Sequence, residues 1–103
     1  MNIISRNTII YYADKYPQAK NQLLGWYKEI IKQDFGNFNE LKSVYGNASI
    51  VNSQRVVFNI KGNDYRLVVA MNFIRKAGYV IWFGTHKEYD KIDVSTVDYN
   101  LDL

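Results

Sequence analysis

The chain has 103 residues, of which 48% are apolar and 22% are charged, and its formal net charge is +3. This length and composition predict one globular domain over residues 1–103 and exclude a disordered chain. No apolar run approaches the roughly 20 residues of a membrane span. There is no cysteine, which excludes disulfides and thiolate metal sites, and residues 1–8 lack the apolar core of a signal peptide. We therefore expect a cytoplasmic protein.

The charge is unevenly distributed. Residues 55–87 carry six lysines and arginines against one acidic residue, Asp64, whereas residues 88–103 carry five acidic residues against Lys91. A basic segment suits contact with a polyanion, although solvated strand ends and turns would show the same excess. Residues 94–103 are expected to form a short acidic tail.

The first half of the chain predicts helices after a short edge strand over residues 1–4. Apolar residues at helical spacing predict a helix over 6–16, which Pro17 ends because the residue before proline disfavours helical geometry. A second helix is expected from Pro17 to about Gln33. Its apolar face is formed by Ala19, Leu23, Tyr27, Ile30 and Ile31, with Trp26 beside it.

A third, shorter helix is expected after Asn37. Asn37 and Glu40 have the spacing of a capping box, in which each side chain satisfies a free backbone N–H of the first turn. Gly46 suits the residue that follows the helix end. Residues 47–54 are polar and are expected to form a connection.

Three strands follow, over residues 56–60, 65–73 and 79–83. Gly62 and Asn63 both tolerate a positive φ and predict a hairpin turn that pairs Asn59 with Arg66. A loop centred on Lys76 and Ala77 is expected to pair the last two strands. The expected pairs there are Ile74 with Tyr79 and Val68 with Thr85. The start of the Gly84–Asp93 segment would then lie near Arg66.

The order of these elements predicts an α+β fold. N-terminal helices would pack on one face of an antiparallel sheet. The alternation of strand 65–73 places Tyr65, Leu67, Val69, Met71 and Phe73 on the face toward the helices. Asn59, Lys61 and Arg66 would share the other face.

The segment Gly84–Asp93, GTHKEYDKID, is the densest polar cluster and contains His86, the single histidine of the chain. His86 is either a structural residue or a proton-transfer group whose charged neighbours tune it. Arg66 is either paired with a nearby carboxylate or a phosphate ligand. Lys61 is a solvated turn residue or a phosphate ligand, and Tyr89 is a core residue, a base-stacking residue or a proton donor.

Two motifs carry a resemblance to a known family. The run VVFNIKGNDYRLVVAMNF and the segment GTHKEYDKID resemble the HigB toxins of type II toxin–antitoxin systems, which are similar to RelE-type toxins. The similarity extends to Tyr16-Pro17 and Trp26-Tyr27 and covers nearly the whole chain. The positions that match the family pattern are Asn59, Lys61, Gly62, Asn63, Tyr65, Arg66, Gly84, Thr85, His86, Glu88, Tyr89 and Asp90. Strand 79–83 departs from the pattern, because relatives often carry a basic residue where Ile81 falls here.

The resemblance implies an endoribonuclease that cleaves messenger RNA on the translating ribosome. It also implies a helix-turn-helix antitoxin of the HigA type as a partner. We expect catalysis without metal or cofactor, by attack of a 2′-hydroxyl on its own phosphodiester. The catalytic residues would be His86, Tyr89, Arg66 and Lys61. The RNA-binding residues would be Arg55, Asn59, Asn63, Thr85 and Lys87.

Two other function classes stay open from the residues alone. A non-catalytic module that binds RNA or the ribosome would show affinity with steep salt dependence and no cleavage. A protein-interaction domain, using its aromatic residues and acidic tail, would show no affinity for RNA.

Overall fold

Residues 1–98 are described by a computed structural model of the chain, and residues 99–103 of the expected tail lie outside the described part. The elements are β1 (Asn2–Ile3), α1 (Arg6–Lys15), a 3₁₀ turn η1 (Pro17–Ala19), α2 (Lys20–Ile30), α3 (Phe38–Val44), β2 (Ser49–Ile50), β3 (Arg55–Ile60), β4 (Tyr65–Asn72), β5 (Ala77–Thr85) and α4 (His86–Tyr89). Across residues 1–98 the strands form one sheet in the order β1-β5-β4-β3-β2, in which β1 is parallel to β5 and the other pairs are antiparallel. The predicted α+β fold is confirmed.

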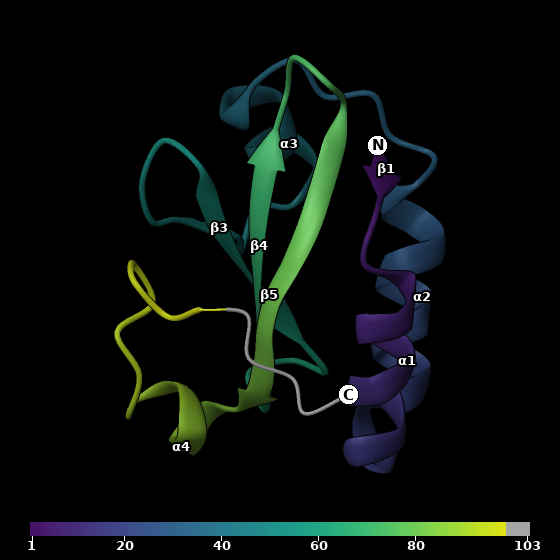
Figure 1. Cartoon of the computed structure of the whole chain (residues 1–103), viewed down its shortest axis with the longest axis vertical. Helices are drawn as coiled ribbons and strands as arrows, with labels where there is room; N and C mark the ends of the chain where they lie inside the picture. The colour runs from purple at the N-terminus through teal and green to yellow at the C-terminus, as the bar shows by residue number, and fades with distance from the viewer. Residues whose placement is uncertain (99–103) are drawn as a thin grey trace.

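Helices α1 and α2 lie on one side of the sheet, and α4 and the segment after it lie on the other (Figure 1). The core between the helices and the sheet contains the predicted stripe of β4, namely Tyr65, Leu67, Val69 and Met71. Trp26 of α2 is buried with this core, whereas Ile31, predicted on the same apolar face, is 43% exposed. In residues 1–98 no helix is both long and apolar enough to cross a membrane.

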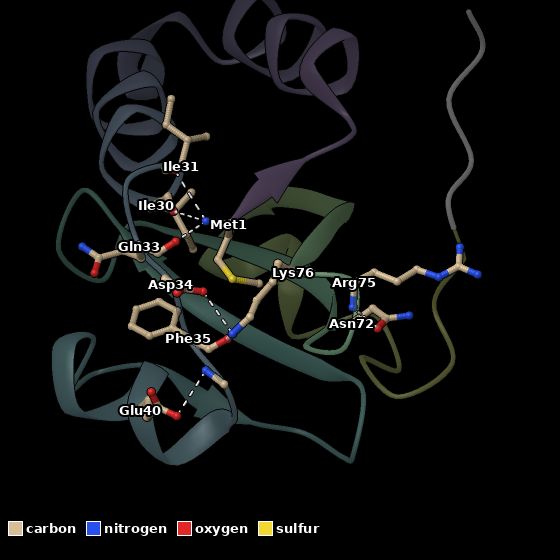
Figure 2. Close-up of polar contacts among 11 residues, drawn as sticks. Met1, Ile30, Ile31, Gln33, Asp34, Phe35, Glu40, Asn72, Arg75 and Lys76 are labelled. Carbon is tan, nitrogen blue, oxygen red and sulfur yellow. Dashed lines mark hydrogen bonds and ion pairs between the residues drawn. The ribbon is translucent and has the colours of Figure 1, made fainter.

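Two positively charged groups, the N-terminal amine and the Lys76 ammonium, connect the segment at the end of α2 to the rest of the fold (Figure 2). The N-terminal amine of Met1 donates to the carbonyl oxygens of Ile30 and Ile31 at the end of α2 and to that of Gln33 just beyond it. Lys76, in the β4–β5 turn, lies 3.0 Å from the Asp34 carboxylate and donates to the Phe35 carbonyl at 2.9 Å. A positive group at a helix C-terminus stabilises the carbonyls left free there.

The predicted β3–β4 register is confirmed, and Asn59 pairs with Arg66. The residues with positive φ in the turn are Lys61 (φ 55°) and Gly62 (φ 64°), so the left-handed positions begin one residue earlier than predicted. Lys61 is therefore itself one of the two left-handed residues of the turn.

The predicted β4–β5 register is wrong. The turn lies earlier than predicted, because Asn72 pairs with Ala77, so Val68 pairs with Trp82 and Thr85 pairs with Tyr65. A bulge between Val68 and Val69 also leaves Ile81 as an extra residue. Ile74 does not pair with Tyr79 but lies in the turn, 96% exposed. The proximity predicted for Arg66 and the start of the Gly84–Asp93 segment holds, since Arg66 pairs with Gly84.

Two short elements were not predicted. Residues 47–54 contain strand β2, which pairs Ser49 with Val57 at the edge of the sheet. Residues 86–89, for which no secondary structure was predicted, form α4. The three predicted N-terminal helices are present, although α2 ends at Ile30 rather than near Gln33.

The face of the sheet away from α1 and α2 is also covered. Val57 and Val68 on this face are 2% and 0% exposed, and neither belongs to the main core. Arg55, on the same face, donates from Nη1 to the carbonyl oxygens of Val94 (3.0 Å) and Val97 (2.6 Å). The first half of the expected tail is therefore held against the sheet.

Candidate active site

The candidate site is built around α4, which starts directly where β5 ends. The Thr85 hydroxyl accepts a hydrogen bond from the Glu88 N–H at 3.2 Å, and Glu88 Oε1 accepts one from the Thr85 N–H at 2.9 Å. These two bonds form a capping box, which satisfies backbone donors that the helix leaves free. The box fixes the direction in which α4 leaves the sheet.

His86 is the first residue of α4 and is oriented by two contacts. Its backbone N–H donates to the Asp64 carbonyl at 2.9 Å, which ties α4 to the β3–β4 turn. Its Nδ1 lies 3.4 Å from Oδ2 of Asp90, one helical turn later. The imidazole is half exposed, at 50% of its side-chain area. A histidine that is oriented by a carboxylate and still open to solvent can exchange a proton with a bound ligand.

Tyr89, at the end of α4, contacts Arg66 of β4. The Arg66 Cζ lies 6.0 Å from the Tyr89 ring centroid, and its Nη1 donates to the carbonyls of Asn63 (3.0 Å) and Tyr65 (3.1 Å). Burial raises the pKa of Tyr89 above its ordinary value, whereas Arg66 acts in the opposite direction. The phenol is therefore protonated at neutral pH and can donate a proton or a hydrogen bond.

The β3–β4 turn and the start of α4 enclose a cleft of about 400 Å³. It is lined by Gln18, Lys61, Asn63, Asp64, Tyr65, Thr85, His86 and Lys87. Lys61, Lys87 and His86 therefore line the same cleft, which suits an anionic ligand such as a phosphodiester. The Asn59 amide lies beside it and donates to the Asn63 side chain at 3.3 Å.

The structure brings most of the predicted site residues together. Lys61, Asn63, Thr85, His86 and Lys87 share the cleft, and Arg66 and Tyr89 form a pair on the adjoining strand and helix. Arg55 is not part of this group, because it lies at the opposite end of β3, where it holds the segment 94–97.

Sequence reasoning missed three residues that adjoin the site. Gln18 of η1 lines the cleft, and Trp82 of β5 packs against Tyr89 with ring centroids 6.1 Å apart. Tyr16 donates from its hydroxyl to Glu88 at 2.9 Å. Strand alternation from Gly84 could have placed Trp82 on the Arg66 face. No local pattern signals Gln18 or Tyr16, which reach the site through tertiary packing.

Among residues 1–98 no group of three or more histidines, aspartates and glutamates is arranged to hold a metal ion. The cationic side chains at the site are those of Lys61, Arg66 and Lys87, and the carboxylates of Asp64, Glu88 and Asp90 lie beside them.

The fold and the cleft define a small α+β domain with lysines and a histidine in one hollow, and comparison with known proteins identifies its family. Residues 19–92 match the HigB toxin family, described as the RelE-like toxic component of a toxin–antitoxin system. The chain is 33% identical over 92 residues to the mRNA interferase toxin HigB of Escherichia coli (strain K12), covering 87% of this chain and 88% of the relative. It is 33% identical, with the same coverage, to the mRNA interferase HigB of Shigella flexneri.

A further relative is the mRNA interferase HigB of Escherichia coli O6:H1, which is 30% identical over 94 residues, 89% of this chain and 91% of the relative. The chain therefore belongs to the HigB toxin family, and the resemblance drawn from the sequence motifs is confirmed. As the toxic component of a toxin–antitoxin system, it has a cognate antitoxin as its partner.

Proposed function

We propose that the chain is an endoribonuclease that cleaves messenger RNA on the translating ribosome without a metal ion. The relatives named mRNA interferase support the RNA substrate and the cleavage. One observation carries the proposal: His86 with Asp90, Tyr89 with Arg66, and the two lysines of the cleft converge on α4 and the adjoining hairpin. These groups match the three needs of RNA cleavage, which are a base, an acid and fixed positive charge.

The proposed reaction begins with the 2′-hydroxyl of the nucleotide before the cut. His86 accepts its proton, and the 2′-oxygen attacks the adjacent phosphorus. The bond from phosphorus to the 5′-oxygen breaks, and Tyr89 donates a proton to that oxygen. The products are a 2′,3′-cyclic phosphate and a 5′-hydroxyl. General base and acid would each contribute about 10²–10⁴-fold to the rate.

Positive charge stabilises the phosphorane in this scheme. Lys61 and Lys87 line the cleft, and Arg66 presents a planar guanidinium beside the proton donor. Such fixed charges act most strongly when they need not reorganise during the reaction. The Asn59, Asn63 and Thr85 side chains would hold the flanking RNA.

The ribosome supplies the alignment that the small cleft does not. A volume of about 400 Å³ is near the lower end of small-ligand pockets, and it would enclose roughly one nucleotide. Holding the 2′-hydroxyl in line with its phosphodiester therefore requires a scaffold around the messenger RNA. We also propose a helix-turn-helix antitoxin of the HigA type as the partner and the cytoplasm as the place of action.

The second candidate function is a non-catalytic module that binds RNA or the ribosome. The adjoining side chains of Arg66, Tyr89 and Trp82 favour it, because aromatic and guanidinium planes stack on bases without chemistry. This module would bind RNA with steep salt dependence and would leave the RNA intact.

Inducible expression in a bacterial host, with primer extension on a translated reporter messenger RNA, tests the proposal. The wild-type chain should arrest growth and produce new 5′ ends within the reading frame, and these should vanish when translation is blocked. A variant with alanine at both Arg66 and His86 should lose both effects. Arg75→Ala is the matched control, because this arginine lies in the β4–β5 turn at the other end of the sheet.

Growth arrest without new 5′ ends would favour the binding module. Full cleavage by the Arg66 and His86 double variant, at wild-type expression and antitoxin binding, would refute the site assignment. Cleavage that persists when translation is blocked would refute the dependence on the ribosome.

A further inference from the structure

Tyr16, the residue that follows α1, packs against the edge of the core and contacts α4 through its hydroxyl. Its hydroxyl donates to Glu88 Oε1 at 2.9 Å, across 72 residues of sequence. Burial and the neighbouring Glu88 carboxylate both raise the pKa of Tyr16. The hydroxyl is therefore a stable donor at neutral pH.

The Tyr16 ring is held in place by the core. It packs edge-on against Tyr65 and Phe83, with centroid distances of 5.7 Å and 5.6 Å. Tyr65 and Phe83 are 8% and 1% exposed and stack on each other. Because the ring is fixed by buried aromatic residues, its hydroxyl presents a rigid anchor at the base of α4.

The Glu88 atom that accepts the hydrogen bond from Tyr16 also completes the capping box. The same Oε1 accepts the Thr85 N–H at 2.9 Å, and this bond holds the pKa of Glu88 below its ordinary value, with a further contribution from Tyr16. A Cβ at Gly84 would lie 3.1 Å from Oε1 and 2.6 Å from the Trp82 ring. The carboxylate is thus held between the Thr85 N–H at the strand end and the Tyr16 hydroxyl.

We propose that Tyr16 is a positioning residue for the active site. Its hydroxyl fixes Glu88, Glu88 fixes the first turn of α4, and that turn carries His86 and Tyr89. This inference rests on the proposed function for its effect on catalysis, although the structural link to α4 can be measured separately. Tyr16 itself is not among the residues that line the cleft.

The kinetic test compares Tyr16→Phe with wild type on translated reporter messenger RNA. Phenylalanine keeps the ring packing and removes only the hydroxyl. The kcat should fall about tenfold with KM unchanged, because misplaced catalytic groups lower the rate while the RNA-binding groups stay in place. Tyr11→Phe is the matched control, since the Tyr11 ring lies on the same helix against Tyr12 and should leave kcat at the wild-type value.

Glu88 variants test whether the effect passes through the carboxylate. Glutamine can accept the same two hydrogen bonds, so Glu88→Gln should keep most of the rate, whereas Glu88→Ala should lower kcat at least as much as Tyr16→Phe. Adding Tyr16→Phe to Glu88→Ala should cause no further loss. A further tenfold loss in the double variant would overturn the proposed link.

Amide hydrogen exchange measures the positioning without reference to catalysis. In Tyr16→Phe, the amides of Thr85, Glu88 and Asp90 should exchange about fivefold faster or more, while those of β3 and β4 stay as in wild type. Unchanged exchange in α4, or a wild-type kcat, would overturn the positioning role. If wild-type protein does not cleave RNA, the proposed function fails, and the exchange experiment still decides whether Tyr16 holds α4.

Discussion

Arg66 lies over the ring of Tyr89, with its Cζ 6.0 Å from the ring centroid, and so connects strand β4 to helix α4. The two carbonyl acceptors of its Nη1, on Asn63 and Tyr65, fix the guanidinium against the hairpin. Burial raises the pKa of Tyr89, and the permanent positive charge of Arg66 opposes this shift, so the phenol stays protonated beside a fixed cation. The pair thus combines a charge for the phosphate with an adjacent acid.

Two substitutions of Arg66 test separately its positive charge and the planar shape of its guanidinium. Arg66→Lys keeps a cation but loses the planar fork, and we expect kcat to fall about tenfold. Arg66→Ala also removes the charge, and a fall of about 10²-fold or more is expected. Single-turnover cleavage of a ribosome-bound reporter messenger RNA measures both, with Arg75→Ala as the control. An alanine variant that cleaves at the wild-type rate would exclude Arg66 from the reaction.

Gly84 should tolerate no side chain. A Cβ there would lie 2.6 Å and 2.7 Å from two carbons of the Trp82 ring, so Gly84→Ala must displace the indole or the strand. We expect a loss of about 1–3 kcal/mol in the free energy of unfolding. Urea denaturation measures it.

Gly25 provides the matched substitution, because a Cβ there meets nothing within 4 Å and the residue lies inside α2. Gly25→Ala should stabilise the protein by roughly 0.5–1 kcal/mol, since alanine favours the helix. Equal effects of the two substitutions would contradict the close packing of Trp82 over Gly84.

The partly buried tyrosines Tyr16 and Tyr89 predict how stability depends on alkaline pH. The pKa values of Tyr16 and Tyr89 are raised above the ordinary value of 10.0, so the folded protein holds these protons more tightly than the unfolded chain. Their contribution to stability is present below pH 10 and is lost as the pH rises above it. Unfolding in urea at pH 8, 10 and 11 should show this loss.

Tyr16→Phe should flatten that dependence, because phenylalanine does not titrate. The slope should be reduced rather than abolished, since burial also raises the pKa of Tyr45. An identical loss of stability in the wild type and Tyr16→Phe would contradict the role of Tyr16 in the alkaline transition.

Arg55 should hold the segment 94–97 on the sheet. Arg55→Ala removes both hydrogen bonds to the Val94 and Val97 carbonyls, and elastase should then cleave this segment several-fold faster. The same variant tests the RNA-binding role predicted from the sequence. If Arg55 contacts a phosphate, Arg55→Ala should lower the salt dependence of RNA binding by about one charge. Unchanged proteolysis would show that other contacts hold the segment.

The sequence predicted the fold class and one hairpin because local signals carried them. Alternating apolar residues and the Gly62 turn set the β3–β4 register correctly. The β4–β5 register failed because the turn comes earlier than predicted, between Asn72 and Ala77, where Lys76 adopts a positive φ (53°) without a glycine signal. A non-glycine residue in that conformation follows from tertiary contacts, here those of Lys76 with Asp34 and Phe35.

The candidate site was predictable where it is local in sequence. The spacing of Thr85 and Glu88 has the signature of a capping box and could have revealed α4. The convergence of α4 with the β3–β4 turn followed from strand pairing. The contribution of Tyr16 could not be predicted, because its contact with Glu88 joins residues 72 positions apart and no sequence period encodes it.

The most direct test of the proposed chemistry is cleavage of a ribosome-bound messenger RNA that carries one 2′-deoxy nucleotide immediately before the cut. Attack by the 2′-hydroxyl requires that this RNA stay intact, while the all-ribose RNA yields a 2′,3′-cyclic phosphate and a 5′-hydroxyl. Cleavage of the deoxy-substituted RNA at the same position, leaving a 5′-phosphate, would show that water is the nucleophile and would contradict the roles proposed for His86 and Tyr89.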